Sequence, residues 1–181
     1  MNSHRQIAQA MERAVTVLTR RPDHGLHDDA SARACWQGGT RITSHHACGT
    51  SMDTDMPVEL GGSGDKVSPG WLFRSGIAAC TATAIGMVAA SEGIALDLLE
   101  VTVGSRSDTR GLLGMCGTDG APIPAGPMEM ELQVRIQAAG VDDARLRQLV
   151  DDGLRRSPMM DALRRHPPTT VAVQVDGHAV G

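Results

Sequence analysis

Residues 67–93, VSPGWLFRSGIAACTATAIGMVAASEG, form the one segment of the chain that is apolar on every side. Between Gly76 and Ala90 the segment carries no charge, and its apolar side chains point in all directions around a helical turn. A helix that is hydrophobic all round is buried. Because the uncharged run is too short to span a bilayer and is bracketed by Arg74 and Glu92, the sequence predicts a buried core helix.

The two ends of this segment carry residues that suit helix termini. Ser68 offers a side-chain oxygen to the first free N–H groups, and the fixed φ of Pro69 suits the first helical position. Gly93 suits the left-handed position after the last turn. We therefore expect the helix to start at residues 68–69 and to end just before Gly93.

The composition narrows the class of protein. The chain has 181 residues, enough for one domain that buries a core without disulfide bridges. Its formal net charge is −4 and it has no run of like charges, so it has neither a basic surface for nucleic acid nor a charged segment for a membrane. Four cysteines in a chain without an apolar leader favour a reducing compartment, and we expect a cytoplasmic protein.

The rest of the chain alternates between helical and strand periods. Helical spacing of apolar residues predicts further helices over residues 5–21, 141–156 and 158–163. Alternating and short apolar runs predict strands over residues 32–36, 40–46, 50–56, 96–105, 128–138 and 171–175. A Gly-rich link at residues 37–39 predicts a tight hairpin between the first two strands. We divide the chain into an N-terminal amphipathic helix with its linker, residues 1–30, and one α+β domain, residues 31–181.

The order of these elements resembles the OsmC/Ohr family, the osmotically inducible and organic hydroperoxide resistance proteins. The motifs that carry the resemblance are Gly61-Gly62, Ser68-Pro69 with Leu72-Phe73, Ala78-Ala79-Cys80 and Glu92-Gly93-Ile94. The resemblance covers about residues 32–175, and the Ser-Pro followed by Ala-Ala-Cys is its most specific part. It implies an OsmC-like α+β fold in which an antiparallel sheet packs on a long buried central helix, and an intertwined homodimer.

The resemblance also implies a set of site residues, of which this chain keeps one. Cys80 falls on the family's peroxidatic position, where a thiol reduces hydroperoxides. Ser157 stands where the family places its resolving Cys and is expected to be inactive in that role. Gly70 stands in place of the family's Glu, and the family's Arg has no counterpart between Thr50 and Val67; Arg41, on an earlier strand, is left unassigned.

The residues alone leave two interpretations of Cys80 open. Free Cys is among the most buried residue types, so Cys80 can be a small apolar packing residue. It can equally be the reactive thiol of a hydroperoxide reductase, although without a nearby charge it would ionise poorly. If Cys80 forms a sulfenic acid, either Cys48 or Cys116 or an external thiol must resolve it; Cys116, in the flexible GMCGT segment, is the preferred internal candidate.

Two functions of different class therefore remain. One is a Cys80-dependent thiol peroxidase for organic hydroperoxides, supplied with electrons by an external thiol. The other is a non-catalytic homodimeric module that binds a small apolar ligand beside the core helix. No cofactor or metal is expected, because the run His45-His46 with Cys48 lacks the spacing of a metal site, and surface histidines account for it.

Overall fold

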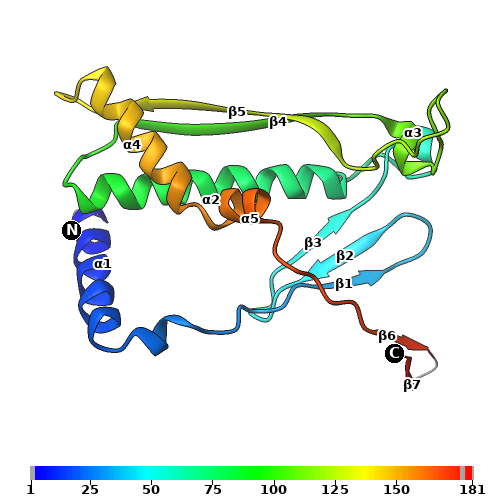
Figure 1. Cartoon of the computed structure of the whole chain (residues 1–181), viewed down its shortest axis with the longest axis horizontal. Coiled ribbons are helices and arrows are strands. Elements are labelled where there is room, and N and C mark those ends of the chain that lie inside the picture. Colours follow the sequence, from blue (N-terminus) through cyan, green and yellow to red (C-terminus); the bar gives the residue numbers. More distant parts are fainter. Residues whose placement is uncertain (1–2, 176–177, 181) are drawn as a thin grey trace.

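The fold is built around α2, Pro69–Ser91, a long helix that runs beneath β4 and β5 (Figure 1). The structure, a computed structural model, describes residues 3–175 and 178–180. Helices α1, α3, α4 and α5 comprise Ser3–Arg20, Thr109–Leu112, Asp143–Arg156 and Pro158–Arg165, with 3-10 turns η1 at Pro22–Gly25 and η2 at Val58–Leu60. The strands are β1 Arg33–Trp36, β2 Ile42–His45, β3 Ser51–Thr54, β4 Leu98–Ser107, β5 Pro127–Gln137, β6 Val173–Val175 and β7 His178–Val180.

Both predicted ends of α2 are confirmed. The Ser68 hydroxyl accepts a hydrogen bond from the backbone N–H of Trp71, and Pro69 is the first helical residue. At the other end Gly93 has a φ of 71°, and its N–H donates to the carbonyl of Ala90. The N–H of Ile94 donates to the carbonyl of Ala89, which completes a Schellman motif. Backbone bonding thus ends the helix where the sequence places its Gly.

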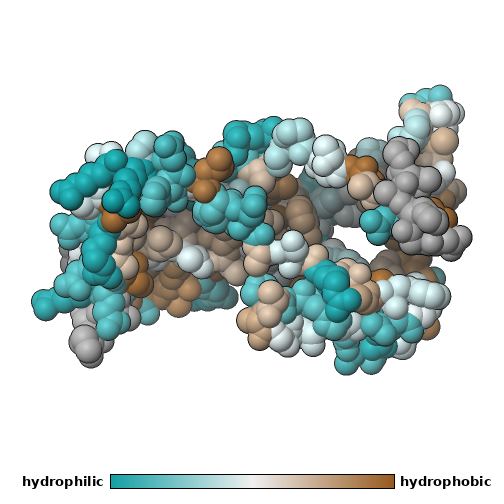
Figure 2. All heavy atoms as spheres, turned by 90° about the horizontal axis from the view of Figure 1, so that it is seen from below, coloured by the Kyte–Doolittle hydropathy of each residue, from teal (hydrophilic) through white to brown (hydrophobic). Residues whose placement is uncertain are grey.

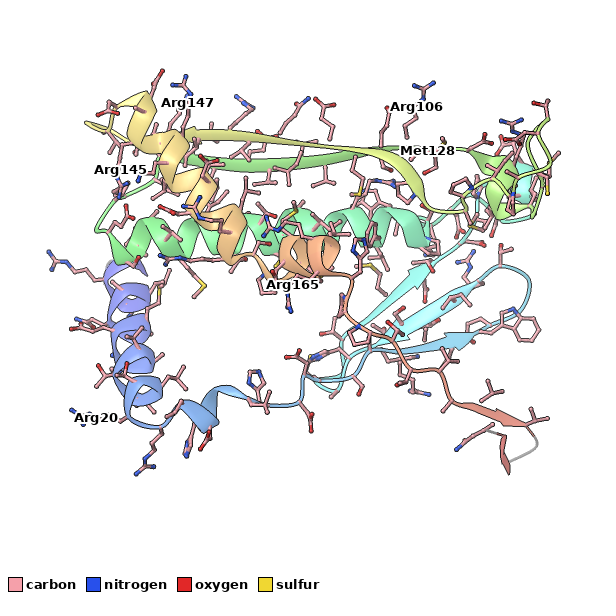
Figure 3. All side chains as sticks on the ribbon, in the orientation of Figure 1. Arg20, Arg106, Met128, Arg145, Arg147 and Arg165 are labelled. Carbon is pink, nitrogen blue, oxygen red and sulfur yellow. The ribbon has the colours of Figure 1, made fainter. Side chains whose placement is uncertain are left out.

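One side of α2 is covered by a long antiparallel hairpin, β4 and β5, and by α4. The hairpin pairs Leu99 with Ile136 and Val101 with Val134, and these apolar side chains face the helix. The core cluster consists of Ile85, Val88 and Ala89 of α2 and Leu149 of α4. Along most of β4, and in β5 from Leu132 onward, alternate residues are exposed, as the two-residue period predicts, whereas the first five residues of β5, including Met128 and Met130, are all exposed. On this outer side Arg106 and Arg147 point away from α2 (Figure 3).

The first three strands form a separate antiparallel sheet, in the order β1-β2-β3. It extends away from the N-terminal end of α2, and its main packing is within the sheet itself (Figure 1). The link between β1 and β2 spans residues 37–41 and is longer than the predicted tight turn. A hydrogen bond from the Gln37 N–H to the Arg41 carbonyl closes it. Gly38 and Gly39 inside the link both take positive φ angles, which accommodates this wider bend.

In the single chain, α2 is buried along one face and partly exposed along the other. Ile77, Thr81 and Ile85 are fully buried, whereas Trp71 is 44% exposed and Met87 is 41% exposed. Seen from below, the molecule shows hydrophobic surface in the recess between its two ends (Figure 2). By length and composition α2 is the one helix of the described chain that could cross a membrane. Its packing on β4 and α4 identifies it as the core helix of a folded domain instead.

The N-terminal helix α1 forms as predicted, but its apolar stripe is only partly covered. Its first turns lie against the C-terminal end of α2, and the helix then runs away from the core (Figure 1). Met11 is half-buried, whereas Val15 is 64% exposed and Leu18 is 39% exposed. The domain boundary at residues 30–31 stays a prediction.

Helices α2 and α4 lie very close together at Gly153, which yields a first testable prediction. A Cβ at Gly153 would lie 2.4 Å from Ile85 Cγ1 and 2.8 Å from Ile85 Cα. Since the backbone of a buried helix must shift to relieve this overlap, we expect Gly153→Ala to lower the free energy of unfolding by about 1–3 kcal/mol. Gly126→Ala is the control, because a Cβ at Gly126 meets no atom within 4 Å. Urea titration of both variants measures the effect, and equal stability of the two would contradict the close approach.

Candidate active site

Cys80 lies near the middle of α2, where the chain brings Ser157 against it. The Ser157 hydroxyl donates a hydrogen bond to Cys80 Sγ over 3.4 Å, although the two residues are 77 positions apart in sequence. Ser157 is fully buried, while Cys80 is partly exposed. The link between α4 and α5 holds Ser157 in place, because both helices pack on α2. The structure thus gives the thiol a fixed hydroxyl neighbour and leaves it access to solvent.

A Ser directly before a Pro commonly caps a helix with its side chain, but Ser157 does not cap α5 in this way. Ser157 occupies the N-cap position, but its side chain makes no capping hydrogen bond there. Its hydroxyl contacts Cys80 instead and lies 3.5 Å from the hydroxyl of Thr81. A hydroxyl that is fully buried needs a polar partner, and these two side chains of α2 supply it. Ser157 is therefore oriented toward the thiol.

Thr81 is a member of this cluster that sequence reasoning missed. Its side chain is fully buried, and its hydroxyl can donate to or accept from Ser157. A buried Thr within a run of Ala residues is the only signal that the sequence offers. Together Cys80, Thr81 and Ser157 form a small polar cluster on an otherwise apolar helix face; we call it the thiol cluster.

No other cysteine joins the thiol cluster among the residues that the structure describes. All four cysteines are free thiols, and Cys48 and Cys116 are exposed. Cys116 forms a β-bridge with Pro122 in the loop region that follows α3, at the end of the molecule that contains the start of α2 (Figure 1). Cys48 lies in the turn between β2 and β3 and contacts His46. Within residues 3–175 and 178–180, no contact between Cys116 and Cys80 supports the prediction that Cys116 is the internal resolving residue.

The position of the absent family Glu lies far from the thiol. Gly70 precedes Cys80 by ten residues on the same helix, which corresponds to a rise of about 15 Å. Arg74, six residues before Cys80, donates a hydrogen bond to the Ser105 hydroxyl of β4. Within one chain, the Arg74 side chain is therefore bonded to β4. The Cys80 sulfur accepts its hydrogen bond from the Ser157 hydroxyl.

Arg41, which the sequence left unassigned, lies in a charged cluster near the start of α2. Its guanidinium donates to Asp55 Oδ2 at 3.0 Å, to Asp65 Oδ1 at 2.5 Å and to the Ser63 hydroxyl at 2.7 Å. Asp55 is buried and also accepts a hydrogen bond from Thr40. The hydroxyls of Ser63 and Thr40 hold the pKa of Asp55 well below its usual range, and Asp65 raises the pKa of Arg41. The cluster ties the first hairpin to the Gly-rich loop that precedes α2.

This cluster predicts a pH-dependent contribution to stability. Because the folded-state pKa of Asp55 is depressed, its stabilising effect is complete above the unfolded pKa of about 3.9 and is lost as the pH falls toward the folded value. We expect Asp55→Asn to destabilise the protein at neutral pH, and the difference from wild type to narrow below about pH 4. Asp53→Asn is the control, because Asp53 accepts a hydrogen bond from a single hydroxyl, that of Thr43. This substitution should lower the free energy of unfolding less than Asp55→Asn does. Urea unfolding at neutral and acidic pH measures both, and a pH-independent difference would contradict the ionised pair.

An apolar cleft opens beside the start of α2. It has a volume of about 640 Å³ and is lined by the loop before α2, the first turn of α2, residues 107–109, Leu112 and Ala125. The lining includes the charged residues Asp55, Lys66 and Asp108. Gly70 is among its lining residues and Cys80 is not. A cleft of this size is in the range of small-molecule sites. Among the residues that the structure describes, no group of three or more His, Cys, Asp or Glu residues is arranged to hold a metal ion.

Comparisons with known proteins agree with this architecture. The model of the OsmC-like protein family matches residues 62–172. An organic hydroperoxide resistance protein of Xanthomonas axonopodis pv. citri (strain 306) is 32% identical over 153 residues, which cover 84% of this chain and 97% of that relative. A relative with the same description from Xanthomonas campestris pv. phaseoli matches equally well.

Solved structures share the fold. The crystal structure of an OsmC like protein from Mycoplasma pneumoniae superimposes with a TM-score of 0.63 at 18% identity, over 77% of this chain and 90% of that one. An organic hydroperoxide resistance protein from Legionella pneumophila gives a TM-score of 0.56 at 24% identity, over 77% of this chain and 92% of that one. The predicted antiparallel sheet on a long central helix is thereby confirmed.

Proposed function

The chain belongs to the OsmC-like family, and from this premise we propose that it reduces organic hydroperoxides at Cys80 with electrons from a small external thiol. Its relatives named for organic hydroperoxide resistance support the general function. The observation that carries the proposal is the 3.4 Å contact between the Ser157 hydroxyl and Cys80 Sγ. The contact supports a reactive Cys80 thiol that is held in one orientation. Because the neighbouring group is a hydroxyl and not a second thiol, we propose that an external thiol resolves the oxidised Cys80.

The first step is attack of the Cys80 thiolate on the terminal oxygen of R–O–OH. The O–O bond breaks, the sulfur becomes a sulfenic acid, and the released alkoxide takes up a proton as the alcohol ROH. A hydrogen bond from a neutral hydroxyl contributes about 0.5–1.5 kcal/mol, which favours one orientation of the Cys80 sulfur. Ser157 is thus assigned the role of a positioning residue that orients the Cys80 sulfur.

The second step consumes the external thiol. Because a serine cannot form a disulfide, one molecule of R′SH attacks the sulfenic acid, which gives a mixed disulfide and water. A second R′SH then releases Cys80 as the thiol and leaves as R′SSR′. The overall reaction converts one hydroperoxide and two thiols into an alcohol, water and a small disulfide. Partial exposure of Cys80 supports access for such a thiol.

The assay is consumption of cumene hydroperoxide by the purified protein with a small monothiol. We expect turnover that is first order in protein and that produces the thiol's disulfide in step with the alcohol. A burst of one equivalent of alcohol, followed by arrest, is expected when the thiol is omitted. Absence of both the burst and the turnover would overturn the proposal.

The apolar cleft beside Gly70 favours a second candidate, a module that binds a small apolar ligand. Hydrophobic residues such as Leu60 and Leu112 line this cleft, at a distance along α2 from the thiol. Native mass spectrometry of the protein as purified distinguishes the two candidates. A retained apolar molecule together with no reaction toward hydroperoxide would favour the binding module.

We also propose that the protein is a cytoplasmic homodimer. The exposed Trp71, Phe73 and Met87 of α2 and the first sheet, which packs mainly within itself, leave apolar surface that a second copy can cover. An obligate interface of this kind buries more than about 2,000 Å² in total. We expect a dimer in sedimentation at micromolar concentration, and a stable folded monomer would contradict it.

A further inference from the structure

Helix α1 lies largely outside the core of the single chain. It packs on the C-terminal end of α2 through its first turns, where Ala8 and Met11 are half-buried. Every residue from position 12 to position 20 is exposed, and the helix runs away from α2 (Figure 1). In the described chain, the core cluster around Ile85 and Leu149 receives no residue from α1. Most of α1 is therefore accessible to another molecule.

The exposed part of α1 is amphipathic. Its apolar residues recur at helical spacing and form a single stripe, which we call the α1 stripe: Ile7, Met11, Ala14, Val15 and Leu18. The opposite side of the helix is polar and carries three arginines, Arg5, Arg13 and Arg20. An apolar stripe of this kind is normally covered in a folded protein, either by the same chain or by a partner.

The α1 stripe borders the recess that shows hydrophobic surface in Figure 2. Leu18 Cδ2 lies 3.6 Å from the position of a Cβ on Gly25, so Leu18 points toward η1, which leads along the recess to β1 (Figure 1). On α2, Ala78 lines a small cavity with Val101 of β4. Met87, nine residues after Ala78, lies on the opposite side of α2 and is 41% exposed. The α1 stripe and the exposed face of α2 thus border the same recess.

Net charge indicates which molecule covers these two apolar faces. Residues 3–21 carry four arginines and one acid, a net charge of +3, so a total of −4 leaves −7 on the rest of the chain. An anionic lipid surface would attract α1 but repel the larger remainder of the molecule. A second copy attracts α1 through its negative body and offers the same apolar faces for burial. Since α1 is about 27 Å long and α2 about 35 Å, one helix can lie along most of the other.

We propose that α1 is an arm whose stripe packs against the exposed face of α2 in a second copy of the chain. In a two-fold symmetric dimer this contact is reciprocal, so the arm of each copy covers α2 of the other. The inference rests on the homodimer proposed above and is independent of the chemistry at Cys80. It assigns α1, which lies outside the core of one chain, to the core of the dimer.

Sedimentation equilibrium of the full chain tests the arm. Val15→Glu combined with Leu18→Glu places two charges in the proposed contact, and we expect the dimer Kd to rise by a factor on the order of 100 or more. Gln9→Glu combined with Thr16→Glu adds the same charge on the polar side of α1 and should change the Kd by less than about threefold. Circular dichroism checks that both variants are folded, which we expect because the α1 stripe lies outside the core cluster.

A photo-crosslink identifies the surface that the arm contacts. Val15→p-benzoylphenylalanine should give a covalent product of twice the chain mass, linked to tryptic peptide 75–106, which contains most of α2. Gln9→p-benzoylphenylalanine, on the polar side, should not give this product.

The outcomes separate this inference from the proposals on which it builds. A monomeric wild type would overturn both the arm and the homodimer, whereas an unchanged Kd in the folded variant with Glu at positions 15 and 18 would overturn the arm alone. A crosslink from position 15 that stays within one chain would also overturn the arm. Binding of the wild type to phosphatidylglycerol vesicles, abolished in the same variant, would assign the α1 stripe to a lipid surface and overturn the proposal.

Discussion

Replacing Cys80 with serine is expected to reduce consumption of organic hydroperoxide to the uncatalysed background. Removal of the attacking atom of a covalent mechanism lowers turnover by a factor on the order of 10³ or more. Serine differs from cysteine by one atom, so the helix and the contact to Ser157 should persist. The measurement is the steady-state rate with cumene hydroperoxide and a monothiol.

Cys116→Ser and Cys48→Ser are the matched controls for this loss. Both thiols are exposed and neither has a recorded contact with Cys80 in the described part of the chain. We therefore expect both variants to keep most of the wild-type rate. Equal activity of wild type and Cys80→Ser would show that Cys80 is not the reactive centre.

The second large effect is expected from Ser157→Cys, which places a sulfur against the Cys80 thiol. The present contact of 3.4 Å between oxygen and sulfur is close enough for a modest shift to allow an S–S bond. We expect one equivalent of hydroperoxide to convert this variant to an intramolecular disulfide, because the new thiolate attacks the sulfenic acid before an external thiol does. Turnover with a dithiol reductant should then rise above that of the wild type.

The disulfide would also stabilise the oxidised variant. It links positions 77 apart, and closure of a loop of that length contributes about 4.5 kcal/mol in the chain-entropy account. Ser91→Cys is the control, because Ser91 ends α2 about 16 Å along the helix from Cys80. Loss of two free thiols with no change of intact mass beyond two hydrogens identifies the bond. Failure of Ser157→Cys to form it, or equal behaviour of Ser91→Cys, would contradict the geometry of the thiol cluster.

Much of the fold was predictable because its signals are local. The all-round apolarity of residues 67–93 and the termini at Ser68 and Gly93 define α2 within two residues of its observed ends. The two-residue period of 128–138 likewise locates β5, and it separates an inner from an outer face from Leu132 onward. Such signals depend on side chains a few positions apart, which the sequence displays directly. The family resemblance added the order in which these elements pack.

What the sequence could not supply depends on contacts between distant positions. A Ser before a Pro is a common helix cap, and only the packing of α4 and α5 on α2 turns the Ser157 hydroxyl toward Cys80. Arg41 meets Asp55 and Asp65 across 14 and 24 positions, beyond the range of any local pattern. The exposure of one face of α2 could not be predicted either. The sequence shows that its side chains are apolar but not which surface covers them.

The most direct test of the central claim is to trap the sulfenic acid. Fully reduced protein is treated with one equivalent of cumene hydroperoxide in the presence of dimedone, which reacts with sulfenic acids, and the labelled peptide is identified by mass spectrometry. We predict one dimedone adduct per chain, on Cys80, formed in step with cumyl alcohol and absent from Cys80→Ser. Alcohol formed without an adduct on Cys80, or an adduct on another cysteine in its place, would contradict the assignment of Cys80 as the peroxide-reducing thiol.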